Sequence, residues 1–97
     1  MYARVATGQV KPGKMEEFIK IYNETQKSVN QQVQGFQSAR LLTDPSTNRG
    51  IAVTIWATES DAKASVTPSV MENVMARFGE VLEGPVTNEF YEVSSDY

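Results

Sequence analysis

The stretch Gly-Ile-Ala-Val-Thr-Ile-Trp-Ala, residues 50–57, decides the fold of this chain. Its β-branched and apolar residues predict a strand, and it carries the only tryptophan of the sequence. A strand with one solvent-exposed face alternates apolar and polar residues, whereas this stretch has a single hydroxyl group. Both faces are therefore expected to be covered, one formed by Ile51, Val53 and Ile55 and the other by Ala52, Thr54 and Trp56.

Further strands and helices are predicted on both sides of this stretch. Loose alternation and β-forming residues predict strands at 2–10, 36–43 and 86–93. Apolar residues at a spacing of three to four predict one helix over about 13–33 and another from Pro68 to about Leu82. A short helical turn over about 58–65 precedes the second of these helices. The order is β-α-β-β-α-β.

Several details of these elements follow from the same patterns. The first helix is expected to include Val29 and Val33 in its apolar stripe. Thr58 and Thr67 are predicted N-caps, with Pro68 at the first helical position. The apolar stripe of the second helix is expected to contain Met71, Val74, Met75, Phe78, Val81 and Leu82. One face of the strand at 36–43 is expected to carry Phe36, Ser38, Arg40 and Leu42.

This order predicts an α+β, ferredoxin-like fold with a four-stranded antiparallel sheet. Right-handed crossovers place both helices on one face of the sheet, which leaves the other face uncovered. Because the strand at 50–57 is apolar on both sides, a second copy of the chain is the simplest cover. We therefore expect a homodimer whose two sheets meet face to face.

Composition excludes several classes of protein and of chemistry. The chain has 97 residues, enough for one domain over 1–97, and a formal net charge of −3 with scattered Lys and Arg, which argues against nucleic-acid binding. No apolar run is long enough to span a membrane and no signal peptide is visible, so a cytoplasmic location is expected. The sequence has no cysteine and no histidine. Thiol nucleophiles, His-based triads, zinc–thiolate sites and histidine as a metal ligand are therefore excluded, and no metal or cofactor is expected.

At this point the chain resembles a known family, the antibiotic-biosynthesis-monooxygenase-like domains of the dimeric α/β-barrel superfamily. The resemblance lies in the order of elements and in a loose motif that spans most of the chain. It implies a homodimeric, small-molecule-binding protein with cofactor-independent monooxygenase activity on an aromatic or quinol-type compound. The residues that carry it are Pro12-Gly13-Lys14, Gly35-Phe36, Leu41, Asp44-Pro45 and the string from Ile55 to Ala62.

The sequence departs from two patterns of this family. Haem-degrading members pair the tryptophan with a histidine on the following helix and with an asparagine on the first strand, where this chain has Val66 and Thr7. Many other members carry a histidine in the segment that corresponds to 62–70, and this chain has none there. The haem-degrading function is therefore disfavoured, and any general base would be a carboxylate, a tyrosine or water.

Several side chains are candidates for the wall of a ligand pocket, and each has a purely structural alternative. Trp56 would either stack on a flat aromatic ligand or fill the core. Arg40 would either pair with an anionic oxygen of a ligand or lie in a surface ion pair. Further candidates are Tyr22 and Gln26 on the first helix, Asn73 and Phe78 on the second helix, and Thr7 on the first strand. No catalytic residue is identified.

Two functions remain open on the sequence alone. The first is the monooxygenase activity, and the second is a non-catalytic ligand-binding or assembly domain on the same scaffold. In both cases the expected partners are a second copy of the chain and a small apolar or aromatic molecule. An enclosed cavity beside Trp56 with converging polar groups would favour the first function, and solid packing there would favour the second.

Overall fold

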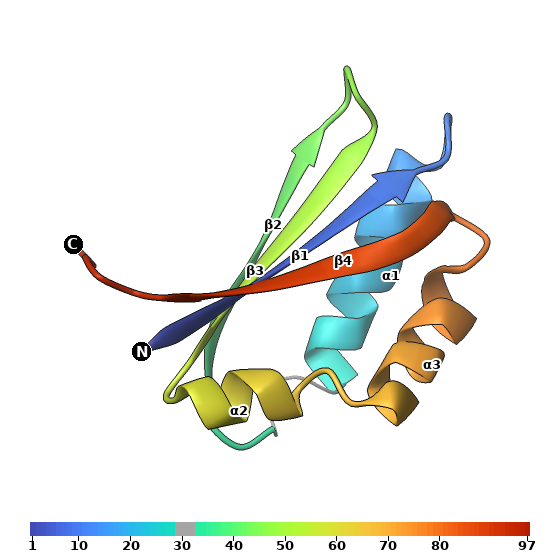
Figure 1. The fold of residues 1–97 in the computed structure, drawn as a ribbon. Coiled ribbons are helices and arrows are strands. Elements are labelled where there is room, and N and C mark those ends of the chain that lie inside the picture. The colour runs from blue at the N-terminus through green and yellow to red at the C-terminus, as the bar shows by residue number, and fades with distance from the viewer. Residues whose placement is uncertain (29–32) are drawn as a thin grey trace.

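The computed structural model describes residues 1–28 and 33–97. Its strands and helices follow one another in the order β-α-β-β-α-α-β (Figure 1). The bounds are β1 Tyr2–Val10, α1 Met15–Ser28, β2 Phe36–Asp44, β3 Arg49–Trp56, α2 Glu59–Ala64, α3 Pro68–Phe78 and β4 Leu82–Glu92.

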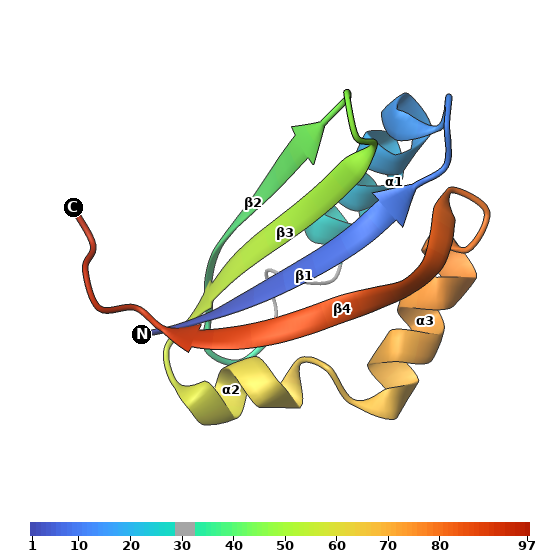
Figure 2. The ribbon, with the colours of Figure 1, turned by 45° about the horizontal axis from the view of Figure 1, so that its top comes forward.

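The four strands form one antiparallel sheet with the order β2-β3-β1-β4. The predicted strand at 50–57 therefore lies inside the sheet as β3, between β2 and β1. Figures 1 and 2 show α1 and α3 on the same side of this sheet, and α2 near the end where β3 finishes. The predicted ferredoxin-like fold is confirmed.

The helices begin as their cap residues predict. The side-chain oxygen of Thr58 accepts the N–H of Asp61 at the start of α2. The side-chain oxygen of Thr67 accepts the N–H of Val70 at the start of α3, where Pro68 needs no hydrogen-bond partner for its nitrogen. These two caps separate α2 from α3 and leave a short connection between them.

The ends of the long helices differ from the prediction. Helix α1 reaches Ser28, and at Val33 the chain is already in a turn that the N–H of Phe36 closes on the Val33 carbonyl, so Val33 is not helical. Val29 lies outside the described residues. Helix α3 ends at Phe78 rather than near Leu82.

The end of α3 has a physical reason in the sheet. Val81 and Leu82 are buried, but Leu82 pairs with Val10 of β1 and the carbonyl of Val81 accepts the N–H of Lys11. Pairing with β1 thus takes up the backbone that the apolar spacing assigned to a helix. As a result β4 begins at Leu82, four residues before the predicted start at Val86.

A register shift in β2 corrects the predicted face of Phe36. The pairing with β3 shifts between Phe36 and Ser38, so Phe36 lies opposite Trp56 and its ring meets the indole edge-on at 5.7 Å. Arg40 pairs with Val53 and follows that residue to the other face. Phe36 and Arg40 are therefore on opposite faces of the sheet, whereas the alternation predicted one shared face.

The two faces of the sheet differ in cover. The face toward the helices contributes to a core built on Val10, Phe18, Tyr22, Phe78, Val81 and Leu82. On the other face, called the open face below, Ile51, Val53 and Ile55 are only partly buried, and Leu42 and Tyr91 expose 51% and 52% of their surface. Within residues 1–28 and 33–97, no helix is long and apolar enough to cross a membrane.

Candidate functional site

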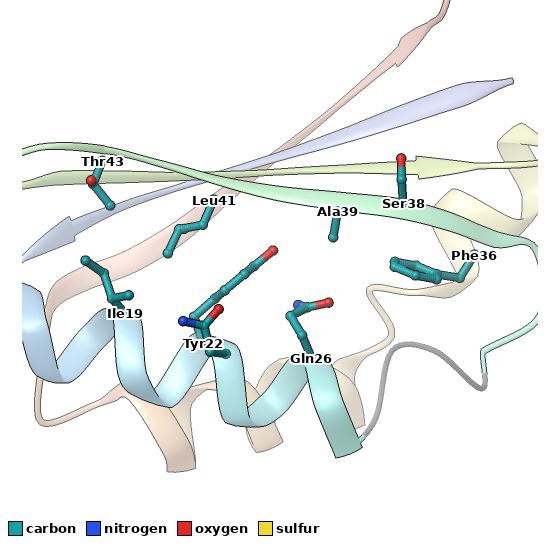
Figure 3. Close-up of a pocket in the computed structure, with 9 residues that line it drawn as sticks. Ile19, Tyr22, Gln26, Phe36, Ser38, Ala39, Leu41 and Thr43 are labelled. Atoms are coloured by element: carbon teal, nitrogen blue, oxygen red, sulfur yellow. The ribbon is translucent and has the colours of Figure 1, made fainter.

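Two hollows adjoin α1 on the helix side of the sheet. The first is an open groove of about 580 Å³ between α1 and the edge strand β2. Figure 3 shows Ile19, Tyr22 and Gln26 rising from α1 toward this strand, while Ser38 points to the opposite side. The second is a cavity of about 220 Å³ between the sheet, α1 and α3. It is less open to solvent than the groove and is called the enclosed cavity below.

The enclosed cavity is apolar except for a few groups. Arg4 is the only residue of Asp, Glu, Lys and Arg type among the described residues that line it. Its polar lining is completed by Tyr22, Thr25, Gln26, Trp56, Ser65 and Asn88. Alternation along the strands brings Arg4, Ala6 and Gly8 of β1 to the same face as Ala52 and Trp56 of β3. This cavity is the candidate site, because charge and polar groups converge in it.

Arg4 is held at the wall of the cavity by neutral partners. Its Nη1 donates to the hydroxyl of Ser65 at 2.6 Å and, more weakly, to the Ser65 carbonyl at 3.4 Å. The guanidinium carbon lies 5.7 Å from the ring centre of Trp56, within the range of a cation–π contact. Its Nε is buried and has no hydrogen-bond acceptor among the described residues. Arg4 therefore retains a donor that none of the described residues uses.

Ser65 fixes Arg4 from the end of α2. It is the C-cap of this helix, and its hydroxyl donates to the carbonyl of Ala62 at 2.5 Å while accepting from Arg4. The short connection between α2 and α3 thus contributes a serine to the site. This is the segment in which many family members were expected to carry a histidine.

Trp56 is 1% exposed and belongs both to the core and to the cavity wall. Its indole N–H donates to the Thr54 hydroxyl at 2.9 Å, and the hydroxyl of Thr54 donates to the carbonyl of Arg4 at 3.4 Å. The indole N–H is thus occupied by its own chain and is not a free donor for a ligand. What Trp56 offers the cavity is its ring.

Tyr22 lines both hollows, and its ring rises from α1 toward the sheet (Figure 3). Its hydroxyl is buried without a hydrogen-bond partner among the described residues. Burial raises the pKa of this hydroxyl, and the positive charge of Arg4 opposes the shift. Tyr22 therefore stays protonated near neutral pH, where it can donate a hydrogen bond.

The structure brings together four of the seven predicted pocket residues. Trp56, Tyr22, Gln26 and Phe78 line the enclosed cavity. Arg40 and Thr7 pair with Val53 and Ile51 and lie on the open face, and Asn73 is exposed on α3 away from the cavity lining. A contact of any of the seven with a ligand remains a prediction.

The sequence interpretation missed Arg4 as a site residue. Arg4 shares its face of β1 with Ala6 and Gly8, so it is the one charged side chain among small residues on that face. A lone arginine on the inward face of a strand is the signal that could have identified it. Asn88 was not selected as a candidate either, and its amide donates to the sulfur of Met71 at 3.7 Å, a weak acceptor.

The lining does not supply a metal site. In the part of the chain that the structure describes, no three His, Cys, Asp or Glu residues gather closely enough to hold a metal ion. The cavity instead offers a positive charge, a tyrosine hydroxyl and an aromatic ring in an apolar setting. Such a set can bind a flat molecule and stabilise negative charge on one of its oxygens.

Residues 1–83 match the family model described as antibiotic biosynthesis monooxygenase. The chain belongs to the antibiotic biosynthesis monooxygenase family. The suspected family resemblance is thereby confirmed over the segment that contains Arg4, Tyr22, Trp56 and Ser65. A comparison with functionally curated proteins found no match.

Solved structures of similar proteins share this fold at low sequence identity. A protein of Bordetella bronchiseptica, provisionally assigned as an antibiotic biosynthesis monooxygenase, is 14% identical with a TM-score of 0.81, over 97% of each chain. A protein of unknown function from Nitrosomonas europaea is 16% identical with a TM-score of 0.81, over 99% of this chain and 91% of that one. A Caulobacter crescentus protein with the same provisional assignment is 20% identical with a TM-score of 0.75, over 97% and 90%. At these identities the likeness shows the fold of this family member alone.

Proposed function

We propose that this protein binds a small, flat and largely apolar molecule in the enclosed cavity and acts on it as a cofactor-independent monooxygenase. The observation that carries the proposal is the cavity beside Trp56, where the Arg4 Nε and the Tyr22 hydroxyl have no hydrogen-bond partner among the described residues. Solid packing around Trp56 would have favoured a purely structural role. The family of the chain supports the same function.

The size of the cavity limits the ligand. Its volume of about 220 Å³ exceeds the roughly 150 Å³ of an engineered cavity that binds benzene and is below the roughly 300 Å³ at which drug-sized pockets begin. A compound of one or two rings suits this volume, with the Trp56 ring as a flat wall. A three-ring compound would need the cavity to widen.

The proposed reaction needs only the substrate, molecular oxygen and an apolar site. An activated methylene next to an aromatic ring or a carbonyl loses a proton, and the resulting carbanion reduces oxygen directly. Overall the CH₂ group becomes C=O, one atom of O₂ becomes the carbonyl oxygen, and the other leaves as water with the two hydrogens. The protein would stabilise negative charge on the substrate oxygen through Arg4 and Tyr22.

Oxygen uptake with a panel of quinols and anthrones tests this proposal. We expect turnover above the buffer rate for one- or two-ring members, and loss of turnover when the cavity is filled by Ala6→Leu, since Ala6 lines it. Glu72→Leu, on the exposed side of α3 and away from the cavity lining, is a control that should keep the wild-type rate. Uptake no faster than buffer throughout the panel would contradict the catalytic part.

A non-catalytic binding domain is the second candidate. It is favoured by the absence of histidine and cysteine from the sequence and of any carboxylate from the described lining of the cavity. Tyr22 is the only side chain of this lining that could serve as a base, and burial works against its ionisation. Binding of panel compounds without oxygen uptake would favour this second candidate.

The proposal includes a homodimer formed through the open face. Val5, Ile51, Val53 and Ile55 form a central apolar strip on this face, beside the half-exposed Leu42 and Tyr91. Strand β3 is thus apolar on both sides over residues 51–56 apart from Thr54, which suits packing of one sheet against another. A second copy is the expected partner because the family is typically dimeric. Light scattering at micromolar concentration that gives a monomer mass would contradict it.

A further inference from the structure

The positive charge of Arg4 is not balanced by any carboxylate of the described chain. The ion pairs within residues 1–28 and 33–97 join Lys14 to Glu17 and Lys63 to Glu59, and all four side chains are about half exposed on helices or beside them. The described lining of the cavity around Arg4 contains no Asp or Glu. A guanidinium that is removed from water and lacks an anionic partner loses hydration that neutral groups only partly replace.

The neutral partners of Arg4 hold its position but leave part of its hydrogen-bonding capacity unused. The Ser65 hydroxyl accepts a hydrogen bond from Nη1, and the centre of the Trp56 ring lies 5.7 Å from the guanidinium carbon. A guanidinium has five N–H donors in a fixed, planar fork, which matches a pair of oxygens on an anion. The buried Nε has no acceptor among the described residues. The guanidinium of Arg4 is therefore held in place before any ligand binds, and at least one of its N–H donors has no acceptor among the described residues.

Tyr22 provides a second buried donor in the same cavity. Its hydroxyl lacks a partner within the described chain, and both Tyr22 and Arg4 belong to the lining of this cavity. A ligand oxygen that accepts from both groups would satisfy two donors that have no partner among the described residues. A neutral apolar ligand would satisfy neither of them.

We propose that the cavity selects ligands that bear one negatively charged oxygen group, and that Arg4 and Tyr22 are the specificity-determining residues. This inference rests on the proposed binding of a small flat molecule and adds the charge of that molecule. Carboxylates arrive already ionised. For an acidic phenol or enol, the O–H bond breaks, the electron pair stays on the oxygen beside Arg4, and the proton passes to bulk water, so no protein base is needed.

Titration with benzoate and its neutral isostere benzamide tests the inference. Trp56 is the only tryptophan and lines the cavity, so its fluorescence reports binding directly. We expect benzoate to bind the wild-type protein at least about tenfold more tightly than benzamide, as is typical of a charge-assisted contact. Equal affinity for the two compounds would overturn the inference and leave the proposed function standing. No binding of either compound would contradict the proposed function itself.

Variants assign the preference to its residues. Arg4→Met should abolish the preference for benzoate, and Tyr22→Phe should reduce it. Arg77→Met removes the same charge from the exposed side of α3, outside the cavity lining, and should leave the preference intact. A preference that survives in folded Arg4→Met, or that disappears in Arg77→Met, would overturn the assignment. The wild-type comparison is decisive even if Arg4→Met does not fold.

A coloured phenol distinguishes the phenolate from the carboxylate as the bound group. Absorbance reports the ionised fraction of bound 4-nitrophenol, and we expect its pKa to fall by at least about one unit on binding, which is a tenfold preference for the anion. The fall should be absent in Arg4→Met. An unchanged or raised pKa of the bound phenol would restrict the ligand to carboxylates and overturn the phenolate part of the inference.

Discussion

The two faces of strand β3 differ in how completely their own chain buries them. On the helix side, Thr54 and Trp56 are buried, and the indole N–H is satisfied by the threonine two residues before it. On the open face, Ile51, Val53 and Ile55 are only partly buried by their own chain. The helices thus bury the helix side into a core that contains a cavity, whereas the open face needs a partner to bury its apolar side chains.

The two sides of the sheet therefore contribute differently to the stability of the single chain and to binding. Burial of apolar side chains by α1 and α3 stabilises the single chain. Arg4 Nε and the Tyr22 hydroxyl, which have no partner among the described residues, lie on that same side and cost stability. Unsatisfied polar groups in an otherwise finished core are typical of sites where a protein gives up stability for binding. The open face carries unsatisfied apolar area instead, which suits association.

The largest effect is expected for Trp56→Ala. The ring is 1% exposed and meets Phe36 edge-on, so its removal should cost about 3 to 5 kcal/mol of unfolding free energy. Urea denaturation followed by circular dichroism measures this, since the variant has no tryptophan to report by fluorescence. Trp56→Phe keeps an aromatic ring and should cost clearly less. A loss below about 1 kcal/mol would mean that Trp56 serves the cavity alone and not the core.

Val53→Asp should weaken association through the open face and leave the core on the helix side intact. A carboxylate buried between two sheets loses its hydration, and Arg40, which pairs with residue 53 on the same face, would offset only part of that loss. Dimer formation should therefore weaken by about 2 kcal/mol, roughly thirtyfold in Kd. Light scattering across a dilution series measures this change. Asn73→Asp adds the same charge on the exposed side of α3 and is the matched control. A variant that stays as dimeric as the wild type would exclude Val53 from the interface.

Tyr22→Phe should stabilise the chain. The substitution removes a buried hydroxyl without a partner among the described residues and keeps the ring in the core, so the unfolding free energy should rise by about 1 kcal/mol. Tyr97→Phe is the control, because Tyr97 is fully exposed in the tail after β4 and loss of its hydroxyl should change stability by less than about 0.5 kcal/mol. If Tyr22→Phe were destabilising, the hydroxyl would have a partner such as a bound water.

The smallest effect concerns the hairpin that joins β2 to β3 and belongs to neither face. The Asp44 carboxylate accepts the N–H and the hydroxyl of Ser46 at 3.0 and 2.7 Å, and the side-chain hydrogen bond is the main cause that lowers the pKa of Asp44. A carboxyl whose pKa is lowered by folding stabilises the folded state above its ordinary pKa of 3.8 and loses that contribution as the pH falls below this value.

Asp44→Asn tests this pH dependence. The wild type should be slightly more stable than the variant near neutral pH, and the difference should shrink as the pH falls from about 5 through the lowered pKa of Asp44. Urea midpoints at several pH values measure the difference between the two proteins. A difference that stays constant down to the most acidic pH would show that ionisation of Asp44 does not contribute.

The local patterns of the sequence predicted most of the fold. The bounds of β1 are those expected, and Thr58 and Thr67 cap the helices that they were assigned to cap. Such features depend on residues a few positions apart, and a single sequence contains that information. Part of the site was predictable for the same reason, because Tyr22 and Gln26 lie one turn apart and both reach the cavity.

Several of the predictions that failed depend on pairing between distant segments. Val81 and Leu82 fit a helical spacing, but Leu82 pairs with Val10. Phe36 fits an alternating strand, but a register shift turns it toward Trp56. Arg4 was not selected because alternation alone does not tell which face of an internal strand meets the helices.

The sequence by itself determined the order of elements, the family, and the chemistry that is impossible without histidine and cysteine. Only the tertiary structure decided that Arg4 of β1, Tyr22 of α1, Trp56 of β3 and Ser65 after α2 surround one cavity. The physical reason is that this cavity is made by side chains that are far apart in the sequence: Arg4 and Ser65, which share a hydrogen bond, are 61 residues apart. Their meeting depends on how the strands pair and on which face the helices pack, and neither is encoded in a local pattern.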